Sequence, residues 1–351
     1  MKLLKYFSIG MIFFLFGCEE ADIEISKFDS DVLFISTRFE NRPGWNLMKM
    51  NENGDLQTKI TELTVRCTRP VISHSGGNIL FVHLTDDGEY ELYSVDTDGT
   101  NQTLIDSAER YCGSASWSFN DSKIVYSKNR NAGTDKKDII LYDISSESKH
   151  TLTNSGNNYS AVFTSNNKIM YCHSTNTQSC GIYIMDMEGN NKQKLISNAC
   201  NPVLSPNGAQ IAYHSTIDDG STQIFIANKD GKNQKQLTSS TSPRTWPGWP
   251  PDGNHDPNWT PNGKRIVYVS WGDGDPEIHI MDSDGTNKNK LTNTDKRDEN
   301  PFVTKNGKYI LFSSSRNIDM NSEIYIMDIY GNNQRSLTNY KYSDNFPVEI
   351  K

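Results

Sequence analysis

The chain has 351 residues, a formal net charge of −8 at pH 7 and 35% hydrophobic residues. No basic stripe stands out, so the charge argues against a nucleic-acid partner. Polar and turn-forming residues are abundant, and helical periodicity is absent after the N-terminal segment, which favours many short strands joined by turns.

The N-terminal segment is predicted to be a bacterial export signal. Two lysines open it, and residues 9–16 form an apolar run that is too short to span a bilayer as a mature helix. The run ends in the letters LFGC and resembles the bacterial lipoprotein signal. This resemblance implies that residues 1–17 are removed and that Cys18 is lipidated, which anchors the chain to a membrane. The alternative is an ordinary signal peptide whose cysteine is incidental. Residues 18–30 are predicted to be a tether.

From residue 31 onward one unit is repeated, and its clearest copy occupies residues 256–292, DPNWTPNGKRIVYVSWGDGDPEIHIMDSDGTNKNKLT. Short β-branched or aromatic runs alternate there with Pro-, Asn-, Asp- and Gly-rich turns, as in antiparallel strands. The strand that follows the first turn of each unit starts at Val32, Ile79, Ile124, Ile169, Ile211, Ile266 and Ile310. A period near 45 residues with four strands per unit predicts an all-β, seven-bladed β-propeller of four-stranded antiparallel blades over residues 31–351.

Units such as NPVLSPNGAQIAYHS, from Asn201, and EIYIMDIYGNNQRSLT, from Glu323, resemble the repeats of TolB-like β-propellers. Such repeats also build the non-catalytic propellers of prolyl-oligopeptidase-type enzymes. The resemblance covers nearly all of the chain after Cys18 and implies the fold. No stretch is expected to form the α/β domain that precedes the propeller in TolB. The resemblance implies little about function, because these propellers host binding, scaffolding and occasional catalysis.

Two segments compete to close the ring beside the strand that starts at Val32. Residues 347–350, PVEI, match the innermost-strand segments of other units, and residues 23–26, IEIS, have the right spacing from Val32. We expect the C-terminal segment to close the ring, because its proline and the preceding Asn-Phe pair match better. Closure would remove the exposed strand edges.

The turns predict two different ends of the propeller. We letter the strands of each blade A to D from the axis outward. The A–B and C–D turns, such as SPNG and KDG, need only the positive φ that Asn-Gly and Asp-Gly supply. The other end, formed by the B–C and D–A loops, carries irregular chemistry and the long insertion at residues 241–255. Insertions gathered at one end of a repeat fold mark a binding face.

The candidate site residues lie at this irregular end. Trp246 and Trp249 belong to a proline-rich stretch of the insertion, which favours extended backbone and presents large side chains to a partner or folds them back as a plug. The predicted ligand- or partner-binding residues are Arg244, Trp246, Trp249, Trp271, His83, His173, His214 and Arg110. A polar plug of the blade ends is the structural alternative for His83 and His173.

Cysteines of an exported protein favour disulfides over metal ligands or nucleophiles. The expected pairs are Cys172–Cys180, which would clip a hairpin, and Cys67–Cys112, which would join adjacent blades; Cys200 is left over.

The sequence contains no nucleophile elbow, zinc-protease motif or phosphate-binding glycine loop. We therefore expect a non-enzymatic binding or scaffolding lipoprotein of the bacterial cell envelope, held at the outer membrane, whose partner is a protein or a glycan. The alternative is a metal-dependent polysaccharide lyase of the oligogalacturonate type, in which His83 and His173 hold a divalent metal. No other cofactor is expected.

Overall fold

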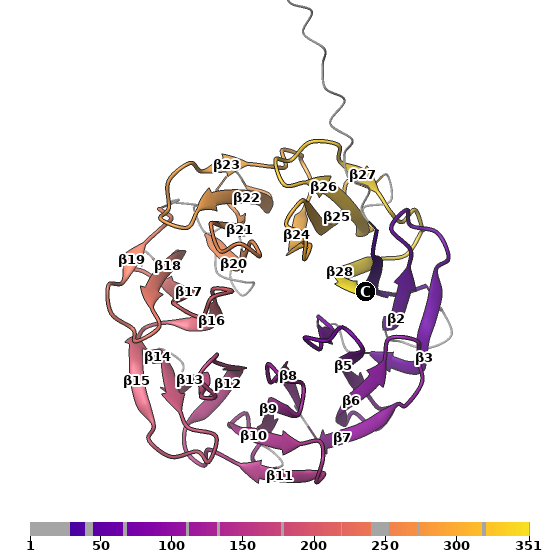
Figure 1. The fold of residues 1–351 in the computed structure, drawn as a ribbon. Coiled ribbons are helices and arrows are strands. Elements are labelled where there is room, and N and C mark those ends of the chain that lie inside the picture. Colours follow the sequence, from indigo (N-terminus) through magenta and orange to yellow (C-terminus); the bar gives the residue numbers. More distant parts are fainter. Residues whose placement is uncertain are drawn as a thin grey trace, which may run out of the picture.

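The computed structural model describes residues 29–38, 45–65, 69–109, 112–131, 134–176, 179–218, 220–239, 253–272, 274–317 and 321–350. Within these ranges every regular element is a β-strand. The strands form seven four-stranded antiparallel blades around one axis (Figure 1), which confirms the predicted fold. Among the residues so described, no helix is long and apolar enough to cross a membrane.

The first four blades each contain four strands, which follow one another from the axis outward. They are blade 1, β28 (Asp344–Ile350), β1 (Asp31–Ser36), β2 (Trp45–Met50) and β3 (Thr58–Val65); blade 2, β4 (Val71–Ile72), β5 (Asn78–Leu84), β6 (Tyr90–Asp96) and β7 (Thr103–Ala108); blade 3, β8 (Cys112–Trp117), β9 (Lys123–Asn129), β10 (Lys137–Asp143) and β11 (Ser148–Thr151); and blade 4, β12 (Asn157–Phe163), β13 (Ile169–Asn176), β14 (Ser179–Met185) and β15 (Gln193–Ser197).

The other three blades follow the same order. They are blade 5, β16 (Cys200–Leu204), β17 (Gln210–Thr216), β18 (Thr222–Asn228) and β19 (Lys235–Gln236); blade 6, β20 (Asn254–Trp259), β21 (Arg265–Ser270), β22 (Glu277–Asp282) and β23 (Asn289–Lys290); and blade 7, β24 (Asp298–Val303), β25 (Tyr309–Ser314), β26 (Glu323–Asp328) and β27 (Arg335–Ser336). The seven B strands start within one residue of their predicted positions.

The C-terminal strand closes the ring, as predicted. β28 pairs antiparallel with β1, from Asp31 opposite Ile350 to Ser36 opposite Asp344. Arg38 adds a buried ion pair to Asp344 at the end of this ladder. The competing segment, residues 23–26, lies outside the described residues. Blade 1 therefore contains strands from both ends of the described chain, and β28 covers the inner edge of β1.

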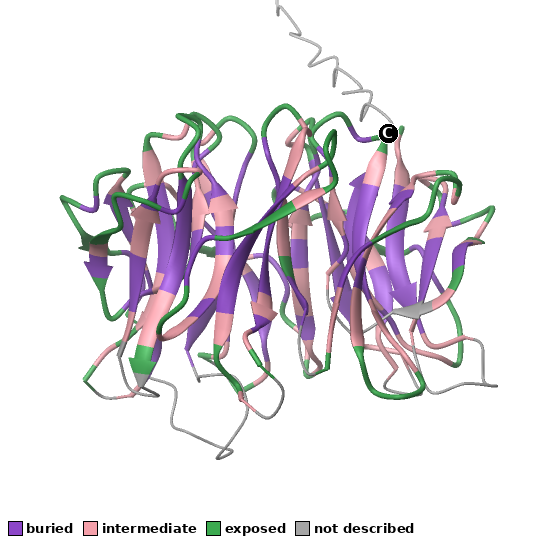
Figure 2. Cartoon of the chain, turned by 90° about the horizontal axis from the view of Figure 1, so that it is seen from below, coloured by how far each residue is buried: buried purple, intermediate pink, exposed green. Residues whose placement is uncertain are grey.

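The hydrophobic core lies between the blades. Side chains alternate along each strand, so Val32 and Phe34 of β1 pack against blade 7 while Leu33 and Ile35 pack against blade 2. Seven such clusters of described residues fill the seven interfaces between neighbouring blades. Figure 2 shows the result, with buried residues in the middle of the strands and exposed residues in the loops.

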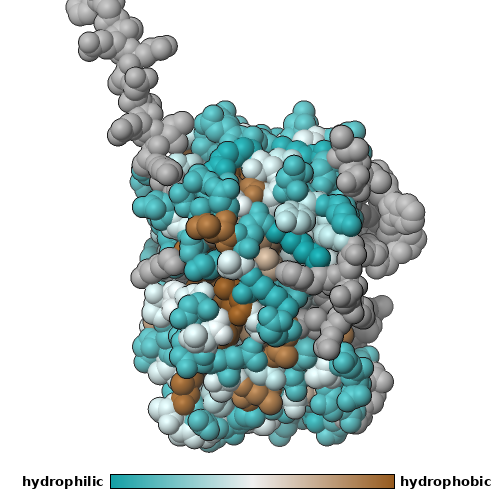
Figure 3. All heavy atoms as spheres, turned by 90° about the vertical axis from the view of Figure 1, so that its right-hand side faces the viewer, coloured by the Kyte–Doolittle hydropathy of each residue, from teal (hydrophilic) through white to brown (hydrophobic). Residues whose placement is uncertain are grey.

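The outer side of the ring carries no large apolar patch in the view of Figure 3, where hydrophilic residues dominate and apolar ones are scattered. Scattered apolar residues are normal for a protein surface. The turns of the regular end pack closely against the next blade: a Cβ at Gly99, whose φ is +88°, would lie 2.5 Å from the carbonyl oxygen of Ile60. Only glycine satisfies both constraints, which explains the Asp-Gly turn at this position.

Candidate functional site

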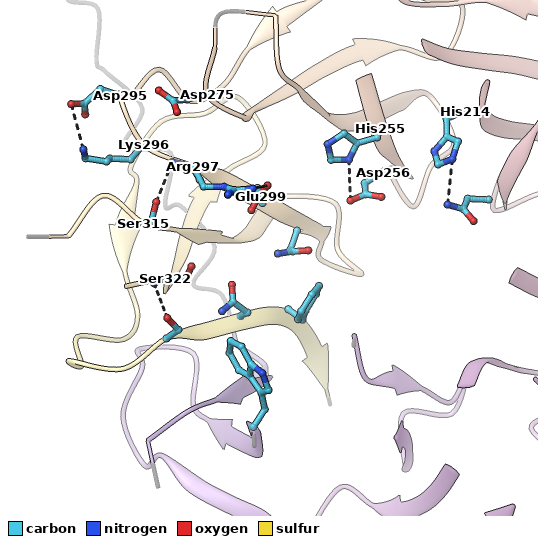
Figure 4. A pocket seen from close by; sticks show the side chains of 16 residues that line it. His214, His255, Asp256, Asp275, Asp295, Lys296, Arg297, Glu299, Ser315 and Ser322 are labelled. Carbon is cyan, nitrogen blue, oxygen red and sulfur yellow. Dashed lines mark hydrogen bonds and ion pairs between the residues drawn. The ribbon is translucent and has the colours of Figure 1, made fainter. Parts of the chain in front are cut away.

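An open pocket lies at the irregular end of the propeller, beside the axis. It has a volume of about 900 Å³ and is lined by residues of blades 5, 6, 7 and 1 (Figure 4). The lining side chains include Asn201, His214, His255, Asp256, Asp275, Asp295, Lys296, Arg297, Glu299, Asn300, Trp45 and Phe346. We call this cavity the axial pocket. It lies at the end of the propeller where the sequence predicted a binding face.

Bulges in the innermost strands bring polar side chains into the pocket. In the A strands of blades 5, 6 and 7, the pairing with the B strand slips by one residue at Asn201, Asp256 and Asn300. Each of these residues has a positive φ of 50–56°, a conformation that Asn and Asp tolerate better than most residues. A bulge re-aims the side chain at its position. The three residues line the pocket for this reason.

A hydrogen-bonded chain orients the carboxylate of Asp256. The indole N–H of Trp271 donates to Nε2 of His255 at 2.9 Å. Because an indole nitrogen is a donor only, Nε2 accepts, and the opposite nitrogen, Nδ1, lies 3.2 Å from Oδ2 of Asp256. Trp271 thus fixes the tautomer of His255, and His255 holds the carboxylate in place.

Asp256 is a charged group of the pocket. Its side chain lines the cavity and is 48% exposed. This partial burial would raise the pKa of Asp256, but the hydrogen bond from His255 and the nearby charges of Arg69 and His214 outweigh it and lower the pKa to about 2. The carboxylate is therefore ionised at neutral pH.

Arg69 reaches toward the pocket from blade 2. Its Nη2 donates to the carbonyl oxygen of Pro301 in blade 7 at 3.5 Å. Burial lowers the pKa of the Arg69 guanidinium, and the negative charge of Asp256 opposes this shift. Asn258 of blade 6 donates to the same carbonyl at 3.2 Å. Residues from three blades thus meet near the axis, where they bring charges of both signs together.

His214 is the only one of the three predicted histidines that lines the axial pocket. Its Nε2 lies 3.4 Å from Nδ2 of Asn201, and its Nδ1 is buried without a hydrogen-bond partner. Burial lowers the pKa of His214, although Cys200 and Asp256 act in the opposite direction. His214 is therefore a neutral group at neutral pH with one nitrogen free to accept or donate.

His83 and His173 are part of the blade structure and do not line the pocket. They occupy the same register of the B strands in blades 2 and 4, and each packs edge-on against a tyrosine of the next strand, Tyr93 or Tyr183. Nδ1 of His173 lies 2.8 Å from Oδ1 of the buried Asn158. The register explains the difference from His214, which is offset by one position and so faces the other side of its blade.

The remaining predicted residues fall into two groups. Trp271, predicted to bind a ligand or partner, is not among the lining residues of the axial pocket; Arg297 stacks over its ring at 5.1 Å from the centroid, and its indole N–H donates to His255. The other residues lie outside the described ranges: Cys18, Cys67, Arg110, Arg244, Trp246 and Trp249. The described end of the insertion, from Gly253, leads directly into His255 and Asp256 of the pocket.

The four described cysteines are free thiols. Cys112 is fully buried in the core between blades 2 and 3, and this burial raises its pKa to about 12. The proposed partner of Cys112, Cys67, is not described. Cys172, Cys180 and Cys200 lie together. Cys200, which had no expected disulfide partner, is thus close to the other two. The Cys172–Cys180 pair predicted from the sequence therefore has two competitors, in which Cys200 pairs with one of these thiols.

The donor geometry does not suit the divalent metal of the alternative function. Nδ1 of His173 is engaged by Asn158, and both ring nitrogens of His255 are engaged by Trp271 and Asp256. Across the described ranges, no three His, Cys, Asp or Glu side chains are grouped so as to hold a metal ion. The predicted ligands His83 and His173 belong to different blades and do not converge.

Sequence reasoning missed Asp256, His255, Asn300 and Arg297. One signal was available: in the five copies whose A strand contains a proline, the residue before it is Arg69, Asn201, Asp256, Asn300 or Phe346. The residue type at this position varies among these copies. Only the structure shows that this position lies in the bulge and that its side chain points toward the axis.

Comparison with known proteins gives partial matches in sequence. No protein-family model matches the chain. A stretch of 113 residues is 29% identical to an uncharacterized protein of Agrobacterium fabrum, over 32% of this chain and 35% of that protein. A stretch of 139 residues is 29% identical to a TolB homolog of Chlorobium chlorochromatii, over 38% of this chain and 28% of that protein. A dipeptidyl-peptidase 5 of Porphyromonas endodontalis is 27% identical over 32% of this chain and 15% of its own length. The matches thus cover 15–35% of these relatives.

Solved structures match over most of the chain at low identity. TolB from Acinetobacter baumannii has a TM-score of 0.53 and 19% identity, with 88% of this chain and 79% of that chain covered. The propeller domain of the Trilobed protease of Pyrococcus furiosus has a TM-score of 0.67 and 15% identity, with 89% and 95% covered. An oligogalacturonate lyase in complex with manganese has a TM-score of 0.59 and 13% identity, with 88% and 85% covered. Such identities show the fold alone, and the fold of this chain is that of a TolB-like β-propeller.

Proposed function

We propose that the chain is a non-enzymatic binding or scaffolding lipoprotein of the bacterial cell envelope, and that it binds a protein or glycan at the axial pocket. The observation that carries this proposal is the pocket itself: a cavity of about 900 Å³ at the irregular end, built from four blades around an ionised carboxylate. Ligand sites commonly combine such a concavity with a few polar groups held in place.

The composition of the pocket favours a polar, extended partner. Asp256 and Glu299 supply negative charge, Lys296 and Arg297 supply positive charge, and Phe346 adds an aromatic surface. Mixed charge orients a partner and sets specificity more than it adds raw affinity. A protein loop or an oligosaccharide meets these requirements, because each offers donors, acceptors and an apolar face.

The side chains that could act as a general acid or base at the pocket are held by other protein groups. His255 has both ring nitrogens occupied, and Trp271 blocks its Nε2 from acting as a base. Asp256 is strongly ionised, and its low pKa makes it a poor proton acceptor at neutral pH. These features support binding over general acid–base chemistry at the pocket.

The envelope location rests on the sequence and on relatives. One partial relative, from Thioalkalivibrio sulfidiphilus, is a Tol-Pal system protein TolB; it is 29% identical over 23% of this chain and 17% of that protein. The lipoprotein-like ending at Cys18 adds the membrane anchor. In this proposal the anchor holds the propeller at the outer membrane, and the axial pocket takes up a partner from the envelope.

Charge-pair variants test the proposal. The mature chain is immobilised, envelope partners are captured from a detergent extract, and glycans are screened on an array. The pocket variant combines Asp256→Asn with Arg297→Gln. The control combines Asp230→Asn with Lys232→Gln, which removes an exposed ion pair of 3.6 Å at the opposite end. We expect the pocket variant to bind the recovered partner at least about 30-fold more weakly, as for a hot spot of about 2 kcal/mol.

Two outcomes would contradict the proposal. In the first, the control variant loses binding while the pocket variant keeps it, which would place the partner at the regular end. In the second, the chain with added manganese cleaves oligogalacturonate and releases an unsaturated product that absorbs in the ultraviolet. That result would favour the lyase.

A further inference from the structure

Three cysteine thiols meet at the interface between blades 4 and 5. Cys172 comes from β13, Cys180 from the start of β14 and Cys200 from the start of β16. The thiols of Cys172 and Cys180 both hydrogen-bond to Cys200. The hydroxyl of Tyr159 lies 3.0 Å from Sγ of Cys180 and 3.5 Å from Sγ of Cys200. A single tyrosine therefore bridges sulfur atoms of two different blades.

Strand register separates the three possible pairs. Cys172 stands opposite Ile182, and Cys180 stands opposite Ser174. Cys172 and Cys180 are thus diagonal neighbours on adjacent strands, where Cα atoms are about 7–8 Å apart. A disulfide needs a Cα separation of about 4.4–6.8 Å. Cys200 belongs to the neighbouring blade, so the β13–β14 ladder does not fix its separation from either thiol.

The environment activates Cys200. Cys172 is fully buried, whereas Cys180 and Cys200 are half-buried. Hydrogen bonds donated by the Cys172 and Cys180 thiols lower the pKa of Cys200, and hydrogen bonds to Cys180 and Cys200 raise the pKa of Cys172. A thiolate is the attacking species in thiol–disulfide exchange. Cys200 is therefore partly exposed, lies near two other thiols and can attack a disulfide as a thiolate.

We propose that Cys172, Cys180 and Cys200 form a thiol–disulfide exchange site, in which Cys200 pairs with either Cys180 or Cys172 while the third thiol stays reduced. The substrate class is a disulfide, either of a small thiol such as glutathione or of a protein oxidant. The site is next to the axial pocket, because Asn201 follows Cys200 and its backbone N–H donates to Sγ of Cys172 at 3.1 Å.

The exchange balances in two steps. The Cys200 thiolate attacks one sulfur of the incoming disulfide, forms a mixed disulfide and releases one thiolate. The thiol of Cys180 or Cys172 then gives up its proton to the thiolate already released, attacks Sγ of Cys200 and releases the other half of the oxidant. In total, the Cys200 thiolate and one cysteine thiol become a disulfide, the incoming disulfide is reduced to one thiol and one thiolate, and the single proton passes to the thiol that is released.

The test maps disulfides in the full chain after equilibration with glutathione disulfide. Free thiols are trapped with an alkylating agent, and linked peptides are identified by mass spectrometry. In the unmodified chain we expect Cys200 linked to Cys180 or Cys172, with the third cysteine alkylated. Cys172→Ser and Cys180→Ser should each retain the remaining pair. In Cys200→Ser, any disulfide between Cys172 and Cys180 should be at least tenfold less abundant than the Cys200 disulfides of the unmodified chain.

Cys112→Ser is the matched control, since it removes a buried thiol from a different interface and should leave the pattern unchanged. Three results would overturn the proposal: a predominant Cys172–Cys180 disulfide in the unmodified chain, all three thiols still reduced in excess glutathione disulfide, or stoichiometric zinc that protects them from alkylation. If Cys200→Ser does not fold, the maps of the unmodified chain and of the other two variants still decide between these results.

Discussion

Replacing Glu323 with glutamine should make the stability of the propeller less dependent on pH. Glu323 opens β26, is 1% exposed, and faces the fully buried Asp344 that opens β28. Its Oε1 accepts the backbone N–H of Tyr340 at 2.6 Å, and its Oε2 accepts the hydroxyl of Thr338. Arg38 compensates the charge of Asp344. Two carboxyl groups thus share one cation in a buried junction of blades 7 and 1.

The magnitude follows from the pKa. Burial, with a further effect of Asp344, raises the pKa of Glu323 from 4.5 to about 7, against hydrogen bonds from Thr338 and Tyr340 and the charge of Arg38. The folded state therefore binds this proton more tightly than the unfolded state. The stabilisation is complete below pH 4.5 and is lost as the pH rises through about 7. The difference between the two pKa values corresponds to at most about 3 kcal/mol in the free energy of unfolding, and we expect about 1–3 kcal/mol.

Blade 5 already contains the neutral form of this junction. Gln223 occupies the equivalent position, and its Oε1 accepts hydrogen bonds from Thr238 at 2.8 Å and from Asn254 at 2.9 Å. Glu323→Gln should therefore be tolerated. Because it removes the group that ionises, its stability relative to the unmodified chain should increase between pH 5 and pH 8.

Urea titrations followed by tryptophan fluorescence at constant ionic strength measure this difference. Glu62→Gln is the control, since that side chain is 94% exposed and should give no pH-dependent difference. If the free energies of unfolding of Glu323→Gln and the unmodified chain stay parallel between pH 5 and pH 8, the reasoning about the buried carboxyl pair is wrong.

Three further predictions concern the ring, the anchor and the insertion. Deleting residues 344–351 removes β28 and its ion pair to Arg38, so the melting temperature should fall by at least several degrees; an unchanged melt would contradict closure by this strand. Cys18→Ser should release the protein from the membrane fraction, and continued dependence on detergent would argue against lipidation. Trp246→Ala with Trp249→Ala should leave the melting temperature within about two degrees and weaken partner binding by at least ~2 kcal/mol. Early unfolding with intact binding per folded molecule would instead make these tryptophans a structural plug.

The repeat made the fold predictable, because each blade needs the same alternation and the same turns. Ile266 and Ile310, for example, lie within one residue of the starts of β21 and β25. The closing strand was predictable for the same reason, since residues 347–350 match other A strands. The period of the sequence thus determines which strands pair within a blade.

The site was less predictable because its residues come from different blades. Arg69 and Asp256 are 187 positions apart in the chain, and their proximity depends on how the ring closes. His173 and His214 look alike in sequence, yet an offset of one residue in the strand places them on opposite sides of their blades. The thiol cluster also depends on an interface between blades, which the spacing of the cysteines does not reveal.

Hydrogen–deuterium exchange of the chain with and without its captured partner tests the axial pocket most directly. We predict that bound partner slows amide exchange in peptides that cover residues 253–258 and 295–300. Peptides that cover the turns at residues 229–233 and 283–287, at the regular end, should exchange at unchanged rates. Protection confined to those turns, with none at the pocket, would contradict the account.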